Sequence, residues 1–190
     1  MLLGYLLGAI PFGLLLARWF GAGDLGEITA EAVMDAQAAG PEHAWELDVP
    51  DEPVPVRVPA AQLQQTVANL LSNARKHTPA GTRVTTSLGI RDGRAVLAVA
   101  DDGPGIPADM RGRIFERFYR ADVARNRASG STGLGLSIVA AIVAAHDGEV
   151  SVRETPGGGA TFVVSLPLAA PDSQAQHSSH HVADETDDVE

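Results

Sequence analysis

The sequence has no cysteine and a single lysine in 190 residues. The absence of cysteine excludes disulfide bonds and thiolate metal sites, and it permits a reducing compartment without proving one. Because Lys76 is the only lysine, it is the only side chain that can offer an ammonium group to an anion. The 45% of apolar residues is sufficient for one ordinary hydrophobic core at this length.

Basic residues are also missing from the C-terminal tail. After Leu168 there is no Lys or Arg, whereas six residues are acidic: Asp172, Asp184, Glu185, Asp187, Asp188 and Glu190. Residues 107–132 show the opposite bias, with six arginines: Arg111, Arg113, Arg117, Arg120, Arg125 and Arg127. This basic segment points to an anionic partner such as a phosphate, although a solvated loop would carry the same arginines. We expect no nucleic-acid partner.

No charged residue interrupts residues 2–17, an apolar run that Arg18, Trp19 and Phe20 close. The run is at the short end of the ~17–25 residues that span a bilayer, and Arg and Trp suit a membrane boundary. A signal peptide is one alternative, but no Lys or Arg precedes the run and the region around Ala22 is a poor cleavage site. A buried or non-native segment is another. We predict an N-terminal hydrophobic helix that contacts a membrane through residues 2–20.

Composition divides the chain into four predicted parts. Helical spacing over residues 28–39 and a strand pattern over 45–49 precede the longest periodic stretch, and Pro50, Pro53 and Pro55 favour an extended connection. The polar, acidic tail should be disordered. The parts are a membrane segment over 1–26, a linker with a short helix over 27–43, a compact domain over 44–168 and the tail over 169–190.

The compact part reads as alternating helices and strands. Apolar residues at helical spacing predict an amphipathic helix over 61–76 and a buried helix over 133–146, with Gly148 as its left-handed cap. Strand patterns cover 83–91, 94–100, 149–154 and 160–167, and Asp92-Gly93 is a two-residue hairpin turn. We predict an α/β fold, a two-layer sandwich in which helices cover one face of a mixed, mostly antiparallel sheet.

Polar residues form a second stripe on the first of these helices. Thr66, Asn69, Asn73 and Lys76 recur at helical spacing. Asparagine is mildly unfavourable inside a helix, so two of them one turn apart require a reason beyond a solvated face. An asparagine oxygen at Asn73 can bind Mg²⁺ that carries nucleotide phosphates, and Lys76 can reach those phosphates as a point charge.

Two glycine-rich turns complete the pattern. Asp101 ends a strand and precedes Gly103 and Gly105, so its carboxylate can accept the exocyclic amine of adenine; a simple Asp-Gly turn is the alternative. Gly133 and Gly135 open the buried helix, whose free N–H groups can bind phosphate. The second turn is neither a Walker P-loop nor a Rossmann fingerprint, because no Gly-Lys-Ser/Thr follows it and a long loop, not a strand, precedes it.

These motifs together resemble the ATP-binding domain of bacterial sensor histidine kinases, in the superfamily with gyrase, the heat-shock chaperone and mismatch-repair ATPases. Residues 69–78 resemble the asparagine box, 101–107 and 130–139 the two glycine boxes, and 113–120 the phenylalanine box. The resemblance implies a Bergerat-type fold, ATP and Mg²⁺ as cofactors, and a mobile lid over 107–132. Asn73 would hold Mg²⁺, Lys76 phosphate and Asp101 adenine. The other implied nucleotide contacts are His77, Gly103, Gly105, Ile106, Phe115, Thr132, Gly133, Leu134, Gly135 and Leu136.

Asn69 separates kinases from hydrolases within this superfamily. The gyrase-like ATPases have a glutamate there that activates water, and the small anti-sigma serine kinases resemble gyrase at this position. An asparagine side chain is not a general base. The resemblance therefore favours a histidine kinase, with Asn69, Asn73 and Lys76 as its catalytic residues.

The expected phospho-acceptor is missing from the sequence. No His-Glu-x-x-x-Pro pattern precedes the domain, and His43 lies in an unrelated context, Gly-Pro-Glu-His. The γ-phosphoryl would then pass in trans to a helical hairpin of a histidine kinase, and onward to a response regulator. The alternative is a non-catalytic nucleotide-binding module. The resemblance also implies a bacterial inner membrane protein with a cytoplasmic catalytic domain, or a cytoplasmic protein if the leader does not span.

Residues 1–26 carry a second resemblance, to the first membrane segment of bacterial glycerol-3-phosphate acyltransferases. The other spans and the catalytic loops of those enzymes are absent, so no acyltransferase activity is expected and a membrane lipid enzyme is the weakest interpretation. The chain is interpreted as a kinase fragment behind a foreign leader, which a gene fusion, degeneration or a misplaced start would each explain.

Overall fold

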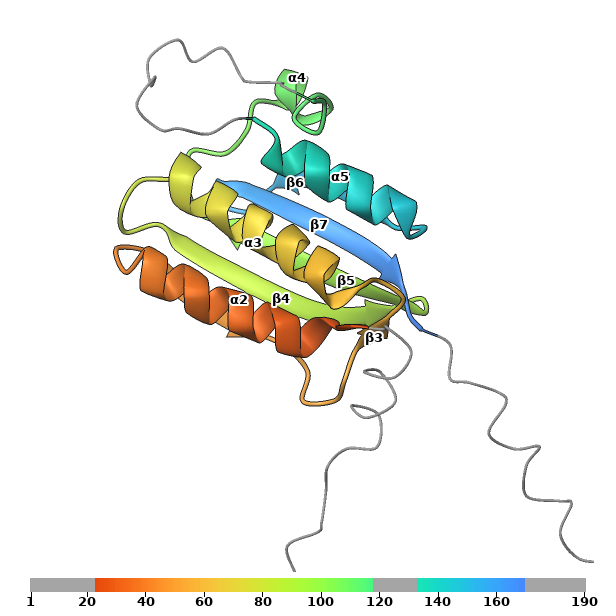
Figure 1. The fold of residues 1–190 in the computed structure, drawn as a ribbon. Coiled ribbons are helices and arrows are strands. Elements are labelled where there is room, and N and C mark those ends of the chain that lie inside the picture. The colour runs from red at the N-terminus through yellow and green to blue at the C-terminus, as the bar shows by residue number, and fades with distance from the viewer. Residues whose placement is uncertain (1–22, 118–132, 170–190) are drawn as a thin grey trace, which may run out of the picture.

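A computed structural model describes residues 23–117 and 133–169 of the chain (Figure 1). Its two layers are a five-stranded sheet and the helices α2, α3 and α5, which all lie on one face of that sheet. This arrangement confirms the predicted two-layer sandwich. The elements in chain order are β1 (Gly23–Asp24), α2 (Leu25–Ala39), β2 (Ala44–Asp48), β3 (Pro55–Val56), α3 (Ala60–His77), β4 (Arg83–Arg91), β5 (Arg94–Asp101), α4 (Ala108–Arg111), α5 (Gly135–Ala145), β6 (Glu149–Glu154) and β7 (Ala160–Pro167).

The main sheet has the strand order β2-β4-β5-β7-β6. β2 and β4 run parallel, as a crossover through α3 allows, and every other neighbouring pair is antiparallel. The prediction of a mixed, mostly antiparallel sheet is therefore confirmed. β1 and β3 form a separate small antiparallel pair beside the start of α2.

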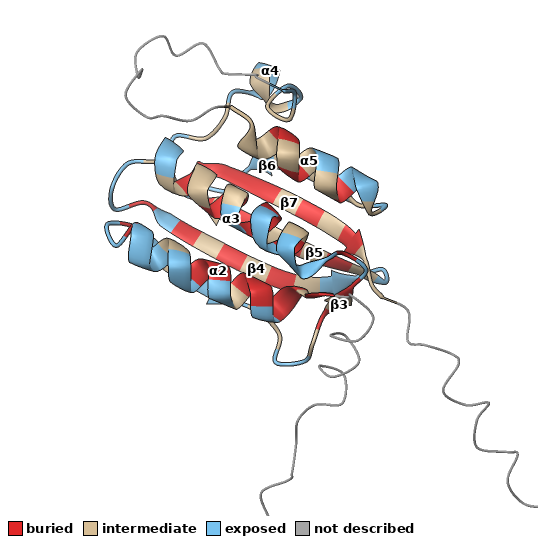
Figure 2. Ribbon diagram, viewed as in Figure 1, coloured by how far each residue is buried: buried red, intermediate tan, exposed pale blue. Residues whose placement is uncertain are grey.

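The core lies between the sheet and the helices (Figure 2). β5 shows the cause most clearly, because its buried and half-buried residues alternate along the whole strand. Its inward residues meet the apolar stripe of α3, in which Leu63, Val67, Leu70 and Leu71 are almost fully buried. This packing fixes the rotation of α3 and hence the direction in which its polar stripe points.

Most predicted boundaries agree with the structure within two residues, but the end of α5 differs. Gly148 was expected to supply the left-handed cap, and instead Asp147 has the positive φ, of 54°. Gly148 is required for close packing. A Cβ there would come within 2.8 Å of the Ser165 carbonyl oxygen and equally close to the side chains of Val143 and Leu166. The cap prediction was wrong because a glycine in the sequence can be required for two reasons. It can adopt a positive φ, or it can leave room for neighbouring atoms, and the sequence does not distinguish these.

The beginning of α2 also differs from the pattern read in the sequence. The helix starts at Leu25, three residues before the expected position, because the Asp24 carboxylate caps it by accepting a hydrogen bond from the Gly26 N–H at 2.9 Å. In the described stretches, no helix is both long and apolar enough to cross a bilayer. The predicted membrane contact through residues 2–20 lies outside them.

Candidate functional site

The polar stripe of α3 faces the start of α5. Asn69 lies in contact range of Gly135, since its side-chain oxygen would be 3.4 Å from a Cβ at that glycine. The Nδ2 atom of Asn69 is buried and has no hydrogen-bond partner in the described residues. Asn73 is half-buried and Lys76 is exposed one turn further on. The structure thus brings the asparagine-bearing helix and the second glycine turn together, as the sequence predicted.

Thr66 shares this face of α3, but the core covers it. The residue is 2% exposed, and its hydroxyl donates to the Gln62 carbonyl oxygen at 2.8 Å. The spacing predicted from the sequence is therefore confirmed, and the hydroxyl is satisfied by its own helix.

Within the described residues, the first turn of α5 has no side-chain cap. Gly133 has a φ of 68°, and Leu134 occupies the N-cap position without a capping hydrogen bond. Free N–H groups at the start of a helix, with the positive end of the helix dipole, favour a bound phosphate. Gly135 and Leu136 follow in this turn. Thr132, another predicted contact, lies outside the described residues.

Asp101 sits at the end of β5 and is 6% exposed. Its Oδ1 atom accepts hydrogen bonds from the Gly103 N–H at 3.0 Å and the Ala160 N–H at 3.2 Å. Burial raises the pKa of this carboxyl group; the two hydrogen bonds oppose the increase, and the neighbouring Asp102 adds to it. In the described part of the chain, no group donates to Oδ2, so one carboxylate oxygen is left for a ligand.

The turn after Asp101 depends on close backbone contact with the start of β7. Gly105 has a φ of 72°, and a Cβ on it would lie 3.0 Å from the Gly159 carbonyl oxygen. A Cβ on Gly159 would collide with the Asp101 carbonyl oxygen. The sequence indicated the role of Gly105, but it gave no signal that Gly159 and Ala160 belong to the same site.

The C-terminal end of α3 adjoins this turn. Thr78, the residue after the helix, packs on Gly103, where a Cβ would be 2.7 Å from the Thr78 methyl carbon. His77 is exposed as a residue, but partial desolvation of its imidazole, followed by the charge of Lys76, lowers its pKa. A neutral His77 leaves the positive charge at this helix end to Arg75 and Lys76.

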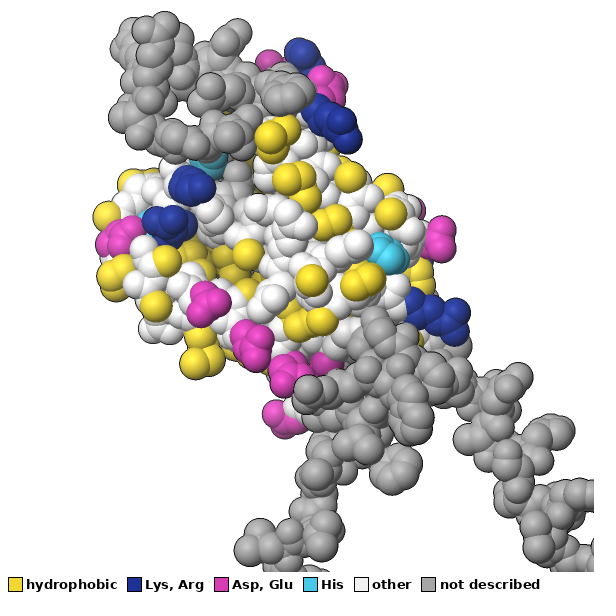
Figure 3. Space-filling view, viewed as in Figure 1, with side chains coloured by type: hydrophobic (Ala, Val, Ile, Leu, Met, Phe, Trp, Pro, Cys, Tyr) yellow, Lys and Arg dark blue, Asp and Glu magenta, His cyan; other side chains and the backbone are white. Residues whose placement is uncertain are grey.

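Charges on the helical face are separated. Acidic side chains gather along α2, where Glu27, Glu31 and Asp35 are exposed, and basic ones gather near the C-terminal end of α3 (Figure 3). An anionic ligand is therefore attracted to the end of α3 that carries Lys76.

Apolar residues support the site from the core side. Ile106, Phe115 and Leu136 are half-buried or partly exposed and pack against the core. The Phe115 ring meets the Phe162 ring edge to face, with 6.4 Å between centroids. Phe115 therefore anchors the described beginning of the predicted lid to β7.

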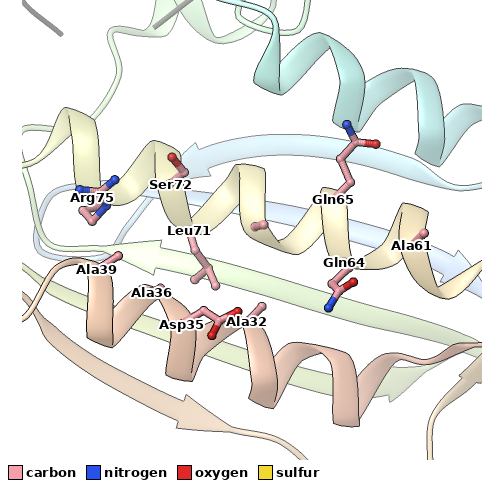
Figure 4. Close-up of a pocket in the computed structure, with 11 residues that line it drawn as sticks. Ala32, Asp35, Ala36, Ala39, Ala61, Gln64, Gln65, Leu71, Ser72 and Arg75 are labelled. Carbon is pink, nitrogen blue, oxygen red and sulfur yellow. The ribbon is translucent and has the colours of Figure 1, made fainter. Parts of the chain in front are cut away.

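Two cavities accompany these elements. One of about 250 Å³ lies along residues 103–107 and is also lined by Arg111, Glu154, Gly158 and Gly159. Arg111 donates to the Ile106 carbonyl oxygen at 2.7 Å and to Glu154 at 3.1 Å. The other cavity, about 440 Å³, lies between α2 and α3, lined mainly by small side chains such as Ala32, Ala36 and Ala61 (Figure 4). It contains none of the predicted site residues.

The oxygen donors suit a cation that shares its ligands with a nucleotide. In residues 23–117 and 133–169, no three His, Cys, Asp or Glu side chains converge on one point. Mg²⁺ does not require such a cage, because it commonly takes one or two protein oxygens together with phosphates and water. The half-buried side chain of Asn73 offers an amide oxygen of this kind, whereas the unpaired atom of Asn69 is its Nδ2, a donor that suits a phosphate oxygen.

Comparison with known proteins gives concordant results. Residues 59–170 match the family described as histidine kinase-, DNA gyrase B-, and HSP90-like ATPase. The probable sensor histidine kinase TcrY of Mycobacterium tuberculosis is 52% identical over 145 residues, which are 76% of this chain and 30% of that protein. The chain thus spans less than a third of that relative.

Solved structures show the same likeness. The mycobacterial sensor histidine kinase MprB has a TM-score of 0.69 at 32% identity, over 77% of this chain and 97% of that one. The ATP binding domain of PrrB from Mycobacterium tuberculosis has a TM-score of 0.64 at 30% identity, over 78% of this chain and 97% of that one.

Proposed function

Because the chain belongs to the histidine kinase-, DNA gyrase B- and HSP90-like ATPase family, we propose that it binds ATP with Mg²⁺ and transfers the γ-phosphoryl group to a histidine. The position of Asn69 beside Gly135 is the observation that favours a kinase over a hydrolase. A water-activating base would have to stand on α3 beside the start of α5, and the side chain there is an amide that does not accept a proton.

Binding would use three described parts of the chain. The free Oδ2 of Asp101 accepts the exocyclic amine of adenine, while Gly103 and Gly105 let the backbone lie close to the base. The first turn of α5 and Lys76 contact the phosphates. Asn73, with Asn69 one turn before it, would hold Mg²⁺, which neutralises phosphate charge when bound.

Transfer would depend on positioning, not on an acid or base of this chain. Phosphoryl transfer proceeds in line between the leaving and attacking oxygen or nitrogen atoms, and catalysis comes from orientation and charge neutralisation. Lys76 and the amides of α5 hold the phosphates from two sides. The acceptor is a histidine on another segment or chain, on a helical hairpin of the kind that sensor histidine kinases use, and a response regulator is the next acceptor.

The test is incubation with ATP labelled on the γ-phosphate, alone and with a separately purified acceptor hairpin of a related sensor kinase. Label on the acceptor's histidine supports the proposal. A matched variant, Asn73→Ala, should lose Mg²⁺-dependent nucleotide binding and all transfer. If Asn73→Ala binds Mg·ATP as tightly as the natural chain, the site assignment is wrong.

A second function is a nucleotide-binding module that transfers nothing. Such a module would use the same Asp101 carboxylate and the same first turn of α5 for binding, without an acceptor. Nucleotide binding by equilibrium dialysis, without label on any supplied acceptor, distinguishes this module from the kinase. Contact with a bacterial inner membrane through residues 2–20 is part of the kinase proposal, and vesicle flotation with and without those residues tests it.

A further inference from the structure

His43 is a buried histidine that the proposed mechanism leaves without a role. It lies in the connection between α2 and β2 and is 7% exposed. Its Nε2 atom is 3.0 Å from the Thr78 hydroxyl, its Nδ1 atom is 3.4 Å from a Glu42 carboxylate oxygen, and its ring lies 5.8 Å from the Trp45 ring. The side chain therefore reaches from the α2–β2 connection to the residue that follows α3.

The hydrogen bonds around Thr78 determine which ring nitrogen of His43 carries the proton. The Thr78 hydroxyl donates its one hydrogen to the Ala74 carbonyl oxygen at 2.8 Å. Its oxygen is then left to accept from His43, and because the Nδ1 atom makes no hydrogen bond, we assign the proton to the Nε2 atom. This assignment makes the contact directional, because a replacement works only if it places an N–H group at the same point.

Thr78 transmits this contact to the turn after Asp101. Its methyl carbon would be 2.7 Å from a Cβ on Gly103, so the two residues already touch across a glycine that has no side chain. Gly103 in turn donates its N–H to Asp101. A continuous series of contacts thus leads from the α2–β2 connection to the carboxylate, through His43, Thr78, Gly103 and Asp101.

Backbone hydrogen bonds hold the same two connections together but do not reach Thr78. Gly81 N–H donates to the Glu42 carbonyl oxygen at 2.8 Å, and Ala44 N–H donates to the Thr82 carbonyl oxygen at 3.0 Å. These two hydrogen bonds fix Gly81 and Thr82, which lie further along the chain than Thr78. The side chain of His43 is the described group that holds the hydroxyl of Thr78 from outside its own helix.

We infer that His43 is a positioning residue for nucleotide binding, which acts through Thr78 on the turn that carries Gly103 and Asp101. This inference rests on the proposed function, since it assigns His43 to the same ATP site. Without the Nε2–H donor, the Thr78 side chain is no longer fixed against Gly103. The turn can then shift, and the free oxygen of Asp101 is no longer held where adenine requires it.

Three substitutions separate positioning from simple packing. His43→Ala removes the donor and the ring. His43→Gln places an amide N–H near the position of Nε2, whereas His43→Asn places one near Nδ1, from which it does not reach Thr78. All three remove the ring and its contact with Trp45, so a purely structural role predicts similar losses of thermal stability and no difference in affinity between them.

The measurement is affinity for Mg·ATP by calorimetry on the full chain, with the unfolding temperature recorded in parallel. We expect His43→Ala and His43→Asn to bind about tenfold more weakly, the loss expected for one hydrogen bond, and His43→Gln to bind within about twofold of the natural chain. Equal affinity of the Gln and Asn variants, or an unchanged affinity in all three, overturns the inference. If His43→Ala does not fold, the Gln and Asn pair decides.

Thr78→Val supplies an independent check. Valine keeps a methyl group against Gly103 and removes the acceptor, so it should weaken binding as His43→Asn does, and the double variant should be no weaker than either single one. Additive losses contradict the inference. Failure of the natural chain to bind nucleotide overturns the proposed function instead, which keeps the two outcomes distinct.

Discussion

Asp101 is a buried carboxyl group that serves both the turn and, by our proposal, the nucleotide. Burial raises its pKa above the ordinary 3.8, so its ionised form opposes folding. A group whose pKa is higher in the folded than in the unfolded protein stabilises the fold fully at a pH below its unfolded-state pKa. That contribution is lost as the pH rises through its folded-state pKa. The natural chain therefore gives up stability at neutral pH to keep a charged acceptor at this position.

The first prediction concerns Asp101→Asn. The amide oxygen can still accept from Gly103 and Ala160, without a buried charge, so the variant should unfold at the same or a higher temperature at pH 7. This advantage should shrink as the pH falls through the raised folded-state pKa, because the natural carboxyl group is then protonated and the buried charge is gone. ATP affinity should fall about tenfold or more, because a hydrogen bond to a charged group is lost. Calorimetric unfolding from pH 4 to 7 checks the first part; an Asp101→Asn protein clearly less stable at pH 7 contradicts it.

The second prediction concerns Gly159. Gly158 and Gly159 both have positive φ, of 115° and 100°, but a Cβ on Gly158 meets nothing within 4 Å whereas one on Gly159 collides with the Asp101 carbonyl oxygen. Gly158→Ala should cost about 1–3 kcal/mol from backbone strain alone. Gly159→Ala should cost more and should also weaken nucleotide binding, because the Asp101 turn must move. Urea unfolding of the pair measures the difference, and equal losses would show that the contact is unimportant.

At the scale of elements, Arg94 joins parts that are distant in sequence. It lies at the end of β5 opposite Asp101 and donates to the Ser165 hydroxyl at 2.6 Å, the Ser165 carbonyl oxygen at 3.1 Å and the Asp147 carbonyl oxygen at 2.9 Å. One planar guanidinium thus connects β5, β7 and the turn between α5 and β6.

The third prediction follows from that position. Arg94→Ala should lower the free energy of unfolding by about 1–3 kcal/mol, since three partly exposed hydrogen bonds are removed. The free energy of unfolding of Arg94→Lys should lie between those of Arg94→Ala and the natural chain, because an ammonium group satisfies fewer of these acceptors. Affinity for Mg·ATP should be unchanged in both, since the site lies at the other end of β5. A tenfold loss of affinity in Arg94→Ala would show that the two ends of the strand are coupled.

Elements with regular patterns were readable in the sequence, and tight contacts between elements were not. The strands 83–91, 149–154 and 160–167 were predicted with the bounds observed, because their side chains alternate and Gly or Asp-Gly turns delimit them. The wrong assignment of Gly148 as a cap depends on neighbours from other elements, Val143, Ser165 and Leu166. Local spacing carries no information about those neighbours.

The same limit applies to the candidate site. Asn69, Asn73, Asp101 and Gly135 were found from motifs, since each belongs to a short run of recognisable residues. Gly159 and Ala160, which contact Asp101, and His43, which we propose as a positioning residue, were not predicted. They reach the site only because β7 pairs with β5 and because the α2–β2 connection packs on the end of α3. No short run of sequence contains that pairing.

At the scale of the whole molecule, the proposed site draws its residues from both layers. Asp101 and Ala160 belong to the sheet, whereas Asn69, Lys76 and Gly135 belong to helices that pack on it. A ligand that bridges the two layers binds the folded chain and not the unfolded one, so it must stabilise the whole domain. Stability is therefore a readout of binding that does not depend on phosphoryl transfer.

The fourth prediction uses this linkage. Mg·ATP at about 100 times its Kd should raise the free energy of unfolding by about 2.7 kcal/mol, and the unfolding temperature should rise with nucleotide concentration. Removing Mg²⁺ with a chelator should abolish most of the rise. In Asn73→Ala the rise should be small and insensitive to the chelator, because the protein oxygen that contacts Mg²⁺ is missing. A rise of the same size in both proteins would place the cation on groups other than Asn73, and GTP, which lacks an exocyclic amine at the position that Asp101 would contact, should produce little rise in either.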